Sequence, residues 1–475
     1  MLLALILIPF LAAVAILGGT PARLTAVVAA LANILVATYA ISCPACSAGF
    51  SIQVLASPEI NLSLGISGIS AVMLILSVIV TLAAVYSGKC PEGREKLWFS
   101  STLLIAAGAI GAFLSTDVFF FYAFHELALI PTFLMIGILG RGDRKEAAWK
   151  ITIYLAFGSI ILLAGLLMAT LHTGSFAFAD LAALPAADQK TVALLLIIGF
   201  GTLVSLFPLH SWAAPAYASA PTPVSMLHAG VMKKFGLYGI LVIAMKVAPQ
   251  GMLYWLPWIC VLLLGNIIWV GLVTINQKRL DLMLGNSSVM HMGYIFLAIA
   301  ALSANPDNSI AVPAAVLLMF AHGISIALLF SLTSVVEQKT GTLEISQLGG
   351  LAKTAPALAF LFGLAGMASI GLPGLANFAG EVMVFFAGFA DWNPADGVVK
   401  LGWVQITTII ALWGVVISAV YMLRAFRSSF QGPLVKSTEG ADDIGYCDRI
   451  PAYVLAVTLL VVGLYPKIIL QFISN

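Results

Sequence analysis

Residues 356–389, PALAFLFGLAGMASIGLPGLANFAGEVMVFFAGF, decide the class of fold. This run of 34 residues is apolar apart from a few polar side chains and one charge, Glu381. A helix crosses a bilayer with about 20 residues, so the run is too long for one straight crossing. Residues 371–374, GLPG, lie inside it and interrupt a helix. We therefore predict one broken transmembrane helix, although two helices or a re-entrant segment fit the same pattern.

The composition of the whole chain agrees with this local pattern. Of its 475 residues, 61% are apolar and 9% are charged, and the mean hydropathy is +1.07. Soluble domains are roughly 45–50% apolar and about 25% charged, so a soluble enzyme, a nucleic-acid binder and a disordered scaffold are excluded. The long apolar runs also exclude the short alternating strands of an outer-membrane barrel. The sequence predicts an all-α polytopic membrane protein, with residues 1–475 as a single membrane domain.

Long apolar runs predict about fourteen transmembrane passes. They are residues 1–17, 24–42, 66–87, 97–116, 117–140, 149–171, 191–214, 223–245, 252–275, 282–304, 311–334, 356–389, 405–422 and 451–470. The seventh pass contains a second break signal at residues 207–209, FPL. No basic residue precedes the first run, so we expect that helix to remain in the mature protein instead of being cleaved.

The basic residues fall mostly on one side of these passes. If the N-terminus lies outside, the inner loops hold 16 of the 22 Lys and Arg residues and the outer loops hold 4. The remaining two, Lys233 and Lys234, lie within a pass. Because positively charged loops remain on the cytoplasmic side, we expect an even number of passes. Both termini are then periplasmic, in a bacterial inner (plasma) membrane.

The loops leave little room for redox chemistry. The longest are residues 43–65 and 423–450, and neither can hold a flavin, a nucleotide or an iron–sulfur cluster. We therefore expect no cofactor on this chain, and any electron transfer must take place on partner subunits.

Ionisable side chains inside the predicted passes are the candidate functional residues. A charge at mid-bilayer costs about 2.5–3.5 kcal/mol, so each one needs a reason. Carboxylates, a desolvated lysine and imidazoles can pass protons through ordered water, and the alternative is a set of static ion pairs that fix helix packing. The candidates for a proton path are Glu126, His210, His228, Lys234, His291, His322 and Glu381. Lys233 is left without a role, since it can snorkel or meet a neighbouring subunit.

Four motifs containing these residues resemble a known family. They are FHELALIP at 124–131; PLHSW at 208–212 with APT at 220–222, Lys234 and YG at 238–239; SSVMHMG at 287–293; and GLPGLANFAGE at 371–381. Their order and spacing over about residues 117–390 are similar to those of the antiporter-like subunits of the proton-pumping NADH:quinone oxidoreductase, respiratory complex I. The chain M type, also called the NADH dehydrogenase subunit 4 type, is the nearest.

The resemblance implies a particular architecture. It implies fourteen helices, of which helices 7 and 12 are broken, with two inverted five-helix repeats. Helices 1–4 occupy residues 1–116, the first repeat (helices 4–8) residues 97–245, the second repeat (helices 9–13) residues 252–430, and helix 14 residues 451–475.

The resemblance also implies roles for individual residues. Glu126 corresponds to the family's helix-five glutamate, Lys234 to its central lysine, and Glu381 to the group near the outer exit. His291 and His322 correspond to members of its central polar line.

The chain departs from the family pattern at several places. Leu203 occupies the place of a helix-seven lysine that pairs with the helix-five glutamate, and residues 214–217, APAY, lack the acid and the histidine usual there. The pair that tunes Lys234 is therefore incomplete.

Three functions remain open at this point. The first is a proton-translocating subunit of complex I that moves protons outward and carries no electrons itself. Quinone, NADH, FMN and iron–sulfur clusters then belong to partner subunits, and neighbouring antiporter-like chains are the closest partners. The alternatives are a subunit of a multi-chain cation/proton antiporter, or of a membrane hydrogenase or inorganic-carbon uptake complex. Nucleic acid is not an expected partner.

Two weaker signals lie in the loops. Cys43 and Cys46 form a CxxC motif that suits a disulfide or two reduced thiols. The acidic group Glu439, Asp442 and Asp443 is expected to be a solvated surface, with subunit docking as the alternative.

Overall fold

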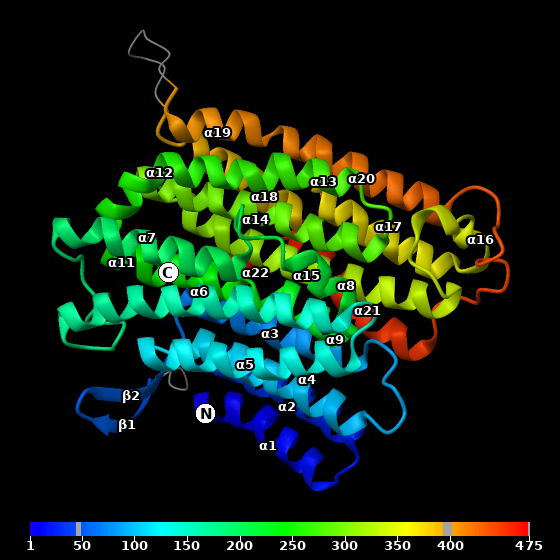
Figure 1. Cartoon of the computed structure of the whole chain (residues 1–475), viewed down its shortest axis with the longest axis horizontal. Helices are drawn as coiled ribbons and strands as arrows, with labels where there is room; N and C mark the ends of the chain where they lie inside the picture. Colours follow the sequence, from blue (N-terminus) through cyan, green and yellow to red (C-terminus); the bar gives the residue numbers. More distant parts are fainter. Residues whose placement is uncertain (44–48, 393–400, 474–475) are drawn as a thin grey trace.

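The computed structural model describes residues 1–43, 49–392 and 401–473. Long helices run back and forth along one direction, which gives the bundle two ends (Figure 1). The helices of the first half are α1 (Leu2–Gly18), α2 (Ala22–Ser42), α3 (Gly68–Tyr86), α4 (Glu95–Leu114), α5 (Val118–Leu139), α6 (Arg144–Thr173), α7 (Ala186–Val204), α8 (Ala213–Ser219), α9 (Thr222–Leu227), α10 (Lys234–Gly239) and α11 (Met245–Val247). Residues 222–247 form one continuous helical pass, in which the π-helical turns η1 (His228–Met232) and η2 (Ile240–Ala244) flank α10.

The second half repeats this pattern of long antiparallel passes. Its elements are α12 (Pro249–Leu264), the π-helical turn η3 (Gly265–Val270), α13 (Gly271–Ile275), α14 (Leu280–Ala304), α15 (Ala311–Thr340), the 3-10 turn η4 (Ile345–Gln347), α16 (Leu351–Thr354), α17 (Pro356–Ile370), α18 (Ala376–Phe389), α19 (Trp403–Ala411), α20 (Trp413–Phe430), α21 (Tyr446–Leu464) and α22 (Lys467–Leu470). The predicted all-α membrane fold is therefore present.

Both predicted helix breaks are present. Helix α7 ends at Ser205, which has a φ of 67°, and helical structure resumes only at α8. Helix α17 ends at Gly371, with a φ of 79°, and α18 starts after residues 371–375. A left-handed residue ends an α-helix by closing its last turn, and the proline that follows cannot restore it. Each break lies in the middle of a pass, where it frees backbone groups inside the protein.

Twelve helices in the described residues are long and apolar enough to cross a membrane. The shorter α1 and the broken α17–α18 pass correspond to the other two predicted passes. The total of fourteen and the two-repeat division remain predictions.

One element in the first long loop was missed. Strands β1 (Phe50–Ala56) and β2 (Glu59–Leu64) form an antiparallel hairpin between α2 and α3. Phe50 pairs with Leu64, and the strand residues on the open face are mostly exposed. Cys46 of the CxxC motif lies outside the described residues.

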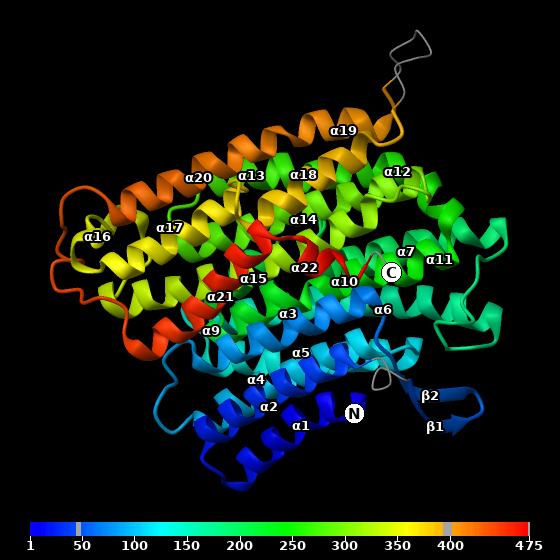
Figure 2. The same cartoon turned by 180° about the vertical axis from the view of Figure 1, so that it is seen from behind.

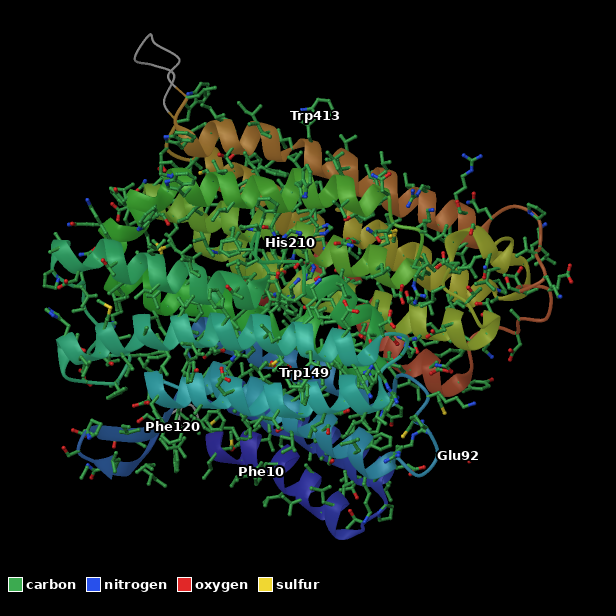
Figure 3. The ribbon with its side chains drawn as sticks, in the orientation of Figure 1. Phe10, Glu92, Phe120, Trp149, His210 and Trp413 are labelled. Atoms are coloured by element: carbon green, nitrogen blue, oxygen red, sulfur yellow. The ribbon has the colours of Figure 1, made fainter. Side chains whose placement is uncertain are left out.

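Helices α9–α11, α14 and α15 form the core of the bundle. Every residue in the most apolar 18-residue window of α15 is buried, and 94% of the equivalent window of α14 is buried. The surrounding helices point large apolar side chains outward, among them Trp149 and Trp413, which are 60% and 65% exposed (Figure 3). A large apolar outer surface is stable in lipid, so this arrangement is that of a multi-pass membrane protein.

The two ends of the bundle differ in charge. One end, here called the basic end, contains the turns after α1, α3, α5, α13, α15 and α20 (Figures 1 and 2). These turns are cross-linked to one another, for example by an ion pair between Arg141 and Glu337 and by a 2.7 Å contact between Lys339 and Asp442. The other end, the hairpin end, holds β1–β2. Both termini lie on that side, because Leu2 packs in one cluster with Leu64 and the backbone of Phe472 meets Gly68.

The long loop before α21 is tied to the start of α17 by Asp443. Its carboxylate accepts hydrogen bonds of 3.0 Å from the backbone N–H groups of Ala357 and Leu358. These are two of the N–H groups that a helix start leaves without a partner inside the helix. The expectation of a solvated acidic group was therefore wrong for Asp443, although it holds for Asp442, whose side chain is 81% exposed. Hydropathy cannot show that a loop carboxylate caps a distant helix.

We expect Asp443→Ala to lower the free energy of unfolding by about 1 kcal/mol, as loss of a helix cap does. Burial opposes ionisation of this carboxyl, but three backbone N–H groups and Arg449 together lower its pKa. The stabilisation is therefore complete above about pH 4, the unfolded value, and is lost as the pH falls through the lower folded pKa. Thermal unfolding of the detergent-solubilised chain measures the effect. Asp442→Asn, the control, should change the midpoint much less, because its ion pair with Lys339 is exposed to solvent.

Candidate functional site

Lys234 lies at the centre of the bundle, at the start of α10. Its side chain is fully buried. The ammonium nitrogen Nζ donates a 2.7 Å hydrogen bond to the carbonyl oxygen of Ala229 and lies 2.9 Å from Nδ1 of His322 on α15. No carboxylate of the described residues comes within 4.0 Å of it. A lysine and an imidazole at hydrogen-bond distance can exchange one proton directly.

His291, on the neighbouring helix α14, is the next ionisable side chain after His322. The two imidazole rings are 5.7 Å apart, centroid to centroid. Both ring nitrogens of His291 lie 2.8 Å from backbone carbonyl oxygens, those of Ser287 and Ser369. A neutral imidazole has one N–H group and can satisfy only one of these acceptors, whereas the protonated ring satisfies both. The site therefore has hydrogen-bond partners for an incoming proton.

Glu381 completes the line on the far side of the break in the twelfth pass. Its carboxylate oxygen Oε1 lies 3.9 Å from Nε2 of His291, and the residue is only 4% exposed. Gly371 makes this position accessible, because a Cβ there would overlap Oε2 of the carboxylate. The break between α17 and α18 thus brings Ser369 and Glu381 to the same imidazole. We call Lys234, His322, His291 and Glu381 the central line.

His228 lies beside the central line, in the π-helical turn η1. It is 3% exposed, and its Nδ1 is 3.4 Å from the hydroxyl of Tyr217 on α8. Tyr217 is the residue that replaces the histidine usual in the resembled pattern. Sequence reasoning passed over it because a tyrosine in an apolar segment carries no charge.

Two predicted site residues lie away from the central line. Glu126 is 36% exposed and opens to a cavity of about 270 Å³ between α5 and α6. Its carboxylate oxygen Oε1 lies 3.5 Å from the ring nitrogen Nδ1 of its chain neighbour His125. The ring of Phe235 stacks on His125 at 4.0 Å and on Phe121 at 4.2 Å. This aromatic group lies between α5 and α10, and no hydrogen bond or ion pair within the described residues joins Glu126 to Lys234.

His210 is the second of these outlying residues. It lies in the break between α7 and α8, is half-buried, and its ring is 5.5 Å from that of Phe207 (Figure 3). Leu203, the departure from the family pattern, is buried in the last turn of α7.

Asn266 was missed by sequence reasoning, and it holds the break in place. Its side-chain oxygen accepts a 2.7 Å hydrogen bond from the backbone N–H of Phe207. Its amide nitrogen donates to the carbonyl oxygens of Ser205 at 3.0 Å and Val289 at 2.9 Å. Freed backbone groups at membrane depth need such partners. A neutral amide inside an apolar run was the available signal, but the search concentrated on ionisable groups.

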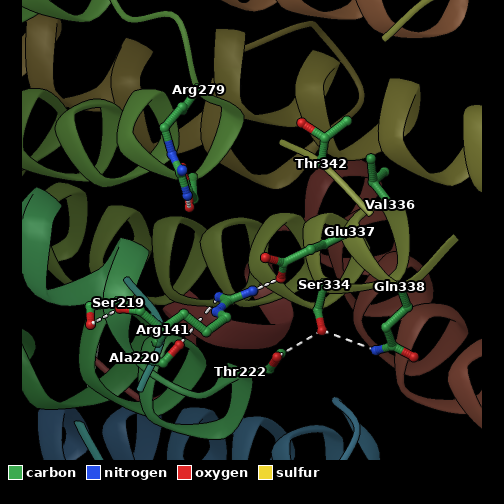
Figure 4. A network of polar contacts seen from close by, with 12 residues as sticks. Arg141, Ser219, Ala220, Thr222, Arg279, Ser334, Val336, Glu337, Gln338 and Thr342 are labelled. Carbon is green, nitrogen blue, oxygen red and sulfur yellow. Dashed lines mark hydrogen bonds and ion pairs between the residues drawn. The ribbon is translucent and has the colours of Figure 1, made fainter. Parts of the chain in front are cut away.

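A network of polar side chains closes the basic end of the bundle (Figure 4). Arg141 pairs with Glu337 and donates to the carbonyl oxygen of Ala220 at 3.3 Å. The hydroxyl of Thr222 donates to that of Ser334 at 2.8 Å. A polar cavity of about 440 Å³ lies beside this network and is lined by Arg141, Glu146, Lys150, Pro215, Arg279 and Glu337, among others. The network connects α15 to the junction of α8 and α9.

Within the described residues, no three His, Cys, Asp or Glu side chains are placed to hold a metal ion together.

A bundle of membrane-spanning helices with two broken passes and a buried line of ionisable side chains defines a polytopic membrane subunit of the antiporter-like class. The sequence profile of the family described as NADH:quinone oxidoreductase/Mrp antiporter, transmembrane, matches residues 115–410. The chain belongs to this family, and the resemblance drawn from its motifs is confirmed.

Curated relatives extend the match. A chain named NAD(P)H-quinone oxidoreductase chain 4 2 from Microcystis aeruginosa is 34% identical over 383 residues, which are 79% of this chain and 67% of the relative. A chain named NAD(P)H-quinone oxidoreductase chain 4 1 from Picosynechococcus is 32% identical over 419 residues, 86% of this chain and 76% of the relative. The predicted subunit-4 type is therefore confirmed.

Solved structures show the same fold. A chain of respiratory complex I from Thermus thermophilus superposes with a TM-score of 0.89, at 24% identity, over 99% of this chain and 97% of that chain. A chain of the Mrp complex from Dietzia superposes with a TM-score of 0.83, at 22% identity, over 99% and 95%. These likenesses confirm the predicted fold class.

Proposed function

We propose that this chain is the proton-translocating, non-redox membrane subunit of an NAD(P)H:quinone oxidoreductase. The observation that carries the proposal is the central line, in which an uncompensated buried lysine contacts an imidazole that leads, through a second one, to a buried carboxyl group. Ionisable groups are retained inside a membrane protein chiefly where they relay protons or ions. Partner subunits supply the cofactors, namely NADH, FMN, iron–sulfur clusters and quinone.

The steps at the central line follow from its contacts. The ammonium group of Lys234 gives a proton to Nδ1 of His322 and becomes a neutral amine. The proton moves to His291, whose two carbonyl acceptors stabilise the doubly protonated ring. Glu381 accepts it and releases it toward the hairpin end. Water molecules bridge the gaps that exceed hydrogen-bond length.

The remaining site residues take supporting roles in this proposal. His228 and His210 belong to the half of the path on the side of the basic end. Glu126 responds to a neighbouring subunit across the partly open α5–α6 face, because it is 36% exposed there.

Donor-driven proton movement in membrane vesicles tests the function. The pH inside vesicles from cells that contain the chain should change when the electron donor and quinone are added. In vesicles without the chain, this pH change should be smaller by the share that the subunit contributes. Replacing sodium with choline should not change the result. A signal that requires a sodium gradient and no donor would support the second candidate, a multi-chain cation/proton antiporter, which the Mrp-like fold also allows.

We propose that the basic end faces the cytoplasm and the hairpin end faces outward, because basic loops remain inside. Cys447, in the first turn of α21 at the basic end, is exposed and reports the orientation. We expect a membrane-impermeant maleimide to label it in inside-out vesicles and to leave it unlabelled in right-side-out vesicles. Cys447→Ser identifies its contribution to the labelling. If Cys447 is labelled only in right-side-out vesicles, the basic end faces outward and the proposed orientation is wrong.

A further inference from the structure

A second lysine is buried beside the central line, and the proposed path does not use it. Lys233 is fully buried, so it neither snorkels to the surface nor meets a neighbouring subunit. Its Nζ donates a 3.3 Å hydrogen bond to the hydroxyl of Ser288 and lies 5.4 Å above the ring of Tyr217. No carboxylate of the described residues lies within 4.0 Å of it. A charged ammonium with so little compensation is costly, so its presence needs an explanation.

The two adjacent lysines have different neighbours, because successive residues of a helix point about 100° apart. Lys233 faces α14 and α8, whereas Lys234 faces His322 on α15. The π-helical turn η1 comes directly before them, and the backbone N–H of Lys233 bonds the carbonyl oxygen of His228, five residues earlier, at 3.0 Å. Single π-helical turns in α-helices occur frequently at functional sites.

Side-chain contacts lead from Lys233 toward the basic end, through polar groups and the ring of Phe330. Tyr217, whose ring lies under the ammonium, is in contact with His228. Phe330 of α15 packs edge-on against Tyr217 at 5.9 Å, and one turn further along α15, Ser334 is bonded to Thr222 (Figure 4). Lys233 therefore lies between the polar network of the basic end and the central line.

We infer that Lys233 is the proton-loading group of this subunit, which receives protons from the side of the basic end and passes them to Lys234. This inference rests on the proposed function. A proton that reaches the neutral amine of Lys233 forms an ammonium, and its charge disfavours a second charge on Lys234, because like charges in a low-dielectric interior repel strongly. Lys234 then gives its proton to His322 and becomes neutral. The proton on Lys233 can move to the empty amine, which resets the pair.

The test compares five variants of the whole assembled complex in proteoliposomes. Lys233→Met removes the proton carrier at similar volume. Lys233→Arg keeps a positive charge, but its guanidinium group does not release its proton. Lys234→Met reports the central line. Lys246→Met is the matched control, because Lys246 is an exposed lysine on the same pass whose ammonium donates to the backbone carbonyl oxygens of Phe178 and Ala179. The measurement is the number of protons moved per electron pair, normalised to the amount of assembled complex.

We expect Lys233→Met and Lys233→Arg to lower this ratio to the value of Lys234→Met, and Lys246→Met to match the wild type. Loss of a positioned proton carrier slows a relay by about a hundredfold, so the contribution of this subunit disappears. Lys233→His, which can still carry a proton, should restore part of the ratio and make it depend on pH between about 6 and 8.

Different failures have different meanings. If Lys233→Arg pumps like the wild type, Lys233 is only a structural cation and the inference is overturned, while the proposed function stands. If Lys234→Met also pumps like the wild type, the proposed function itself is wrong. If Lys233→Met does not assemble, Lys233→Arg and Lys233→His are compared instead. Equal numbers of protons per electron pair in these two variants would overturn the inference.

Discussion

We expect Lys234→Met to remove most of the proposed proton translocation by this subunit while the complex still assembles. Methionine has nearly the volume of lysine and carries no proton, so His322 loses the group that lies 2.9 Å from its Nδ1. We expect proton flux through the subunit to fall about a hundredfold, which is the contribution of a positioned acid or base. The measurement is dye-reported proton uptake per electron pair in proteoliposomes.

Assembly is expected to survive this change, because burying a lysine without a carboxylate partner costs free energy that methionine does not. Lys234→Arg should be as defective as Lys234→Met, since a guanidinium group keeps its proton. Normal pumping by Lys234→Arg would mean that the interior needs a fixed charge at this position and not a proton carrier.

We expect Gly371→Ala to disrupt the far end of the central line. The φ of 79° at this residue is unfavourable for alanine by about 1–2 kcal/mol. The added Cβ would also overlap the carboxylate of Glu381, so that carboxylate must move away from His291. We expect lower thermal stability together with a loss of proton translocation as large as that of Glu381→Gln.

Gly374→Ala separates backbone strain from displacement of the carboxylate. Gly374 has a similar φ of 90°, but the nearest atom to an added Cβ is Cδ2 of Leu464, at 3.9 Å. This variant should lose stability by a similar amount and keep its proton-to-electron ratio. An equal proton-to-electron ratio in Gly371→Ala and Gly374→Ala would show that the position of the Glu381 carboxylate does not matter for translocation.

Hydropathy and helix breakers predicted much of the fold, because lipid imposes simple requirements on a chain. An interrupted run such as residues 356–389 can satisfy its backbone only inside a protein, and the structure has the break at Gly371. The hairpin β1–β2 and the cap formed by Asp443 were not foreseen. Both lie in loops, where water satisfies the backbone and hydropathy carries little information.

The site was predicted in part. A charged residue deep in an apolar run had to be functional or paired, and Lys234 and Glu381 satisfy that argument by meeting His322 and His291. The position of a residue within an apolar run does not show in which direction its side chain points or which helices are its neighbours. For this reason the exposure of Glu126 and the aromatic group around Phe235 could not be foreseen.

The central line has an electrical consequence. Lys234, His322 and His291 each lie near the middle of their own pass, so the line crosses the bundle from helix to helix and not from one membrane face to the other. Membrane voltage acts along the normal, and it costs about 2.3 kcal/mol per charge and 100 mV. In the proposed mechanism, a proton that moves along the central line does almost none of that work. We therefore expect the membrane voltage to act on proton entry from the basic end and on proton release at the hairpin end, and a high voltage to slow those two stages first.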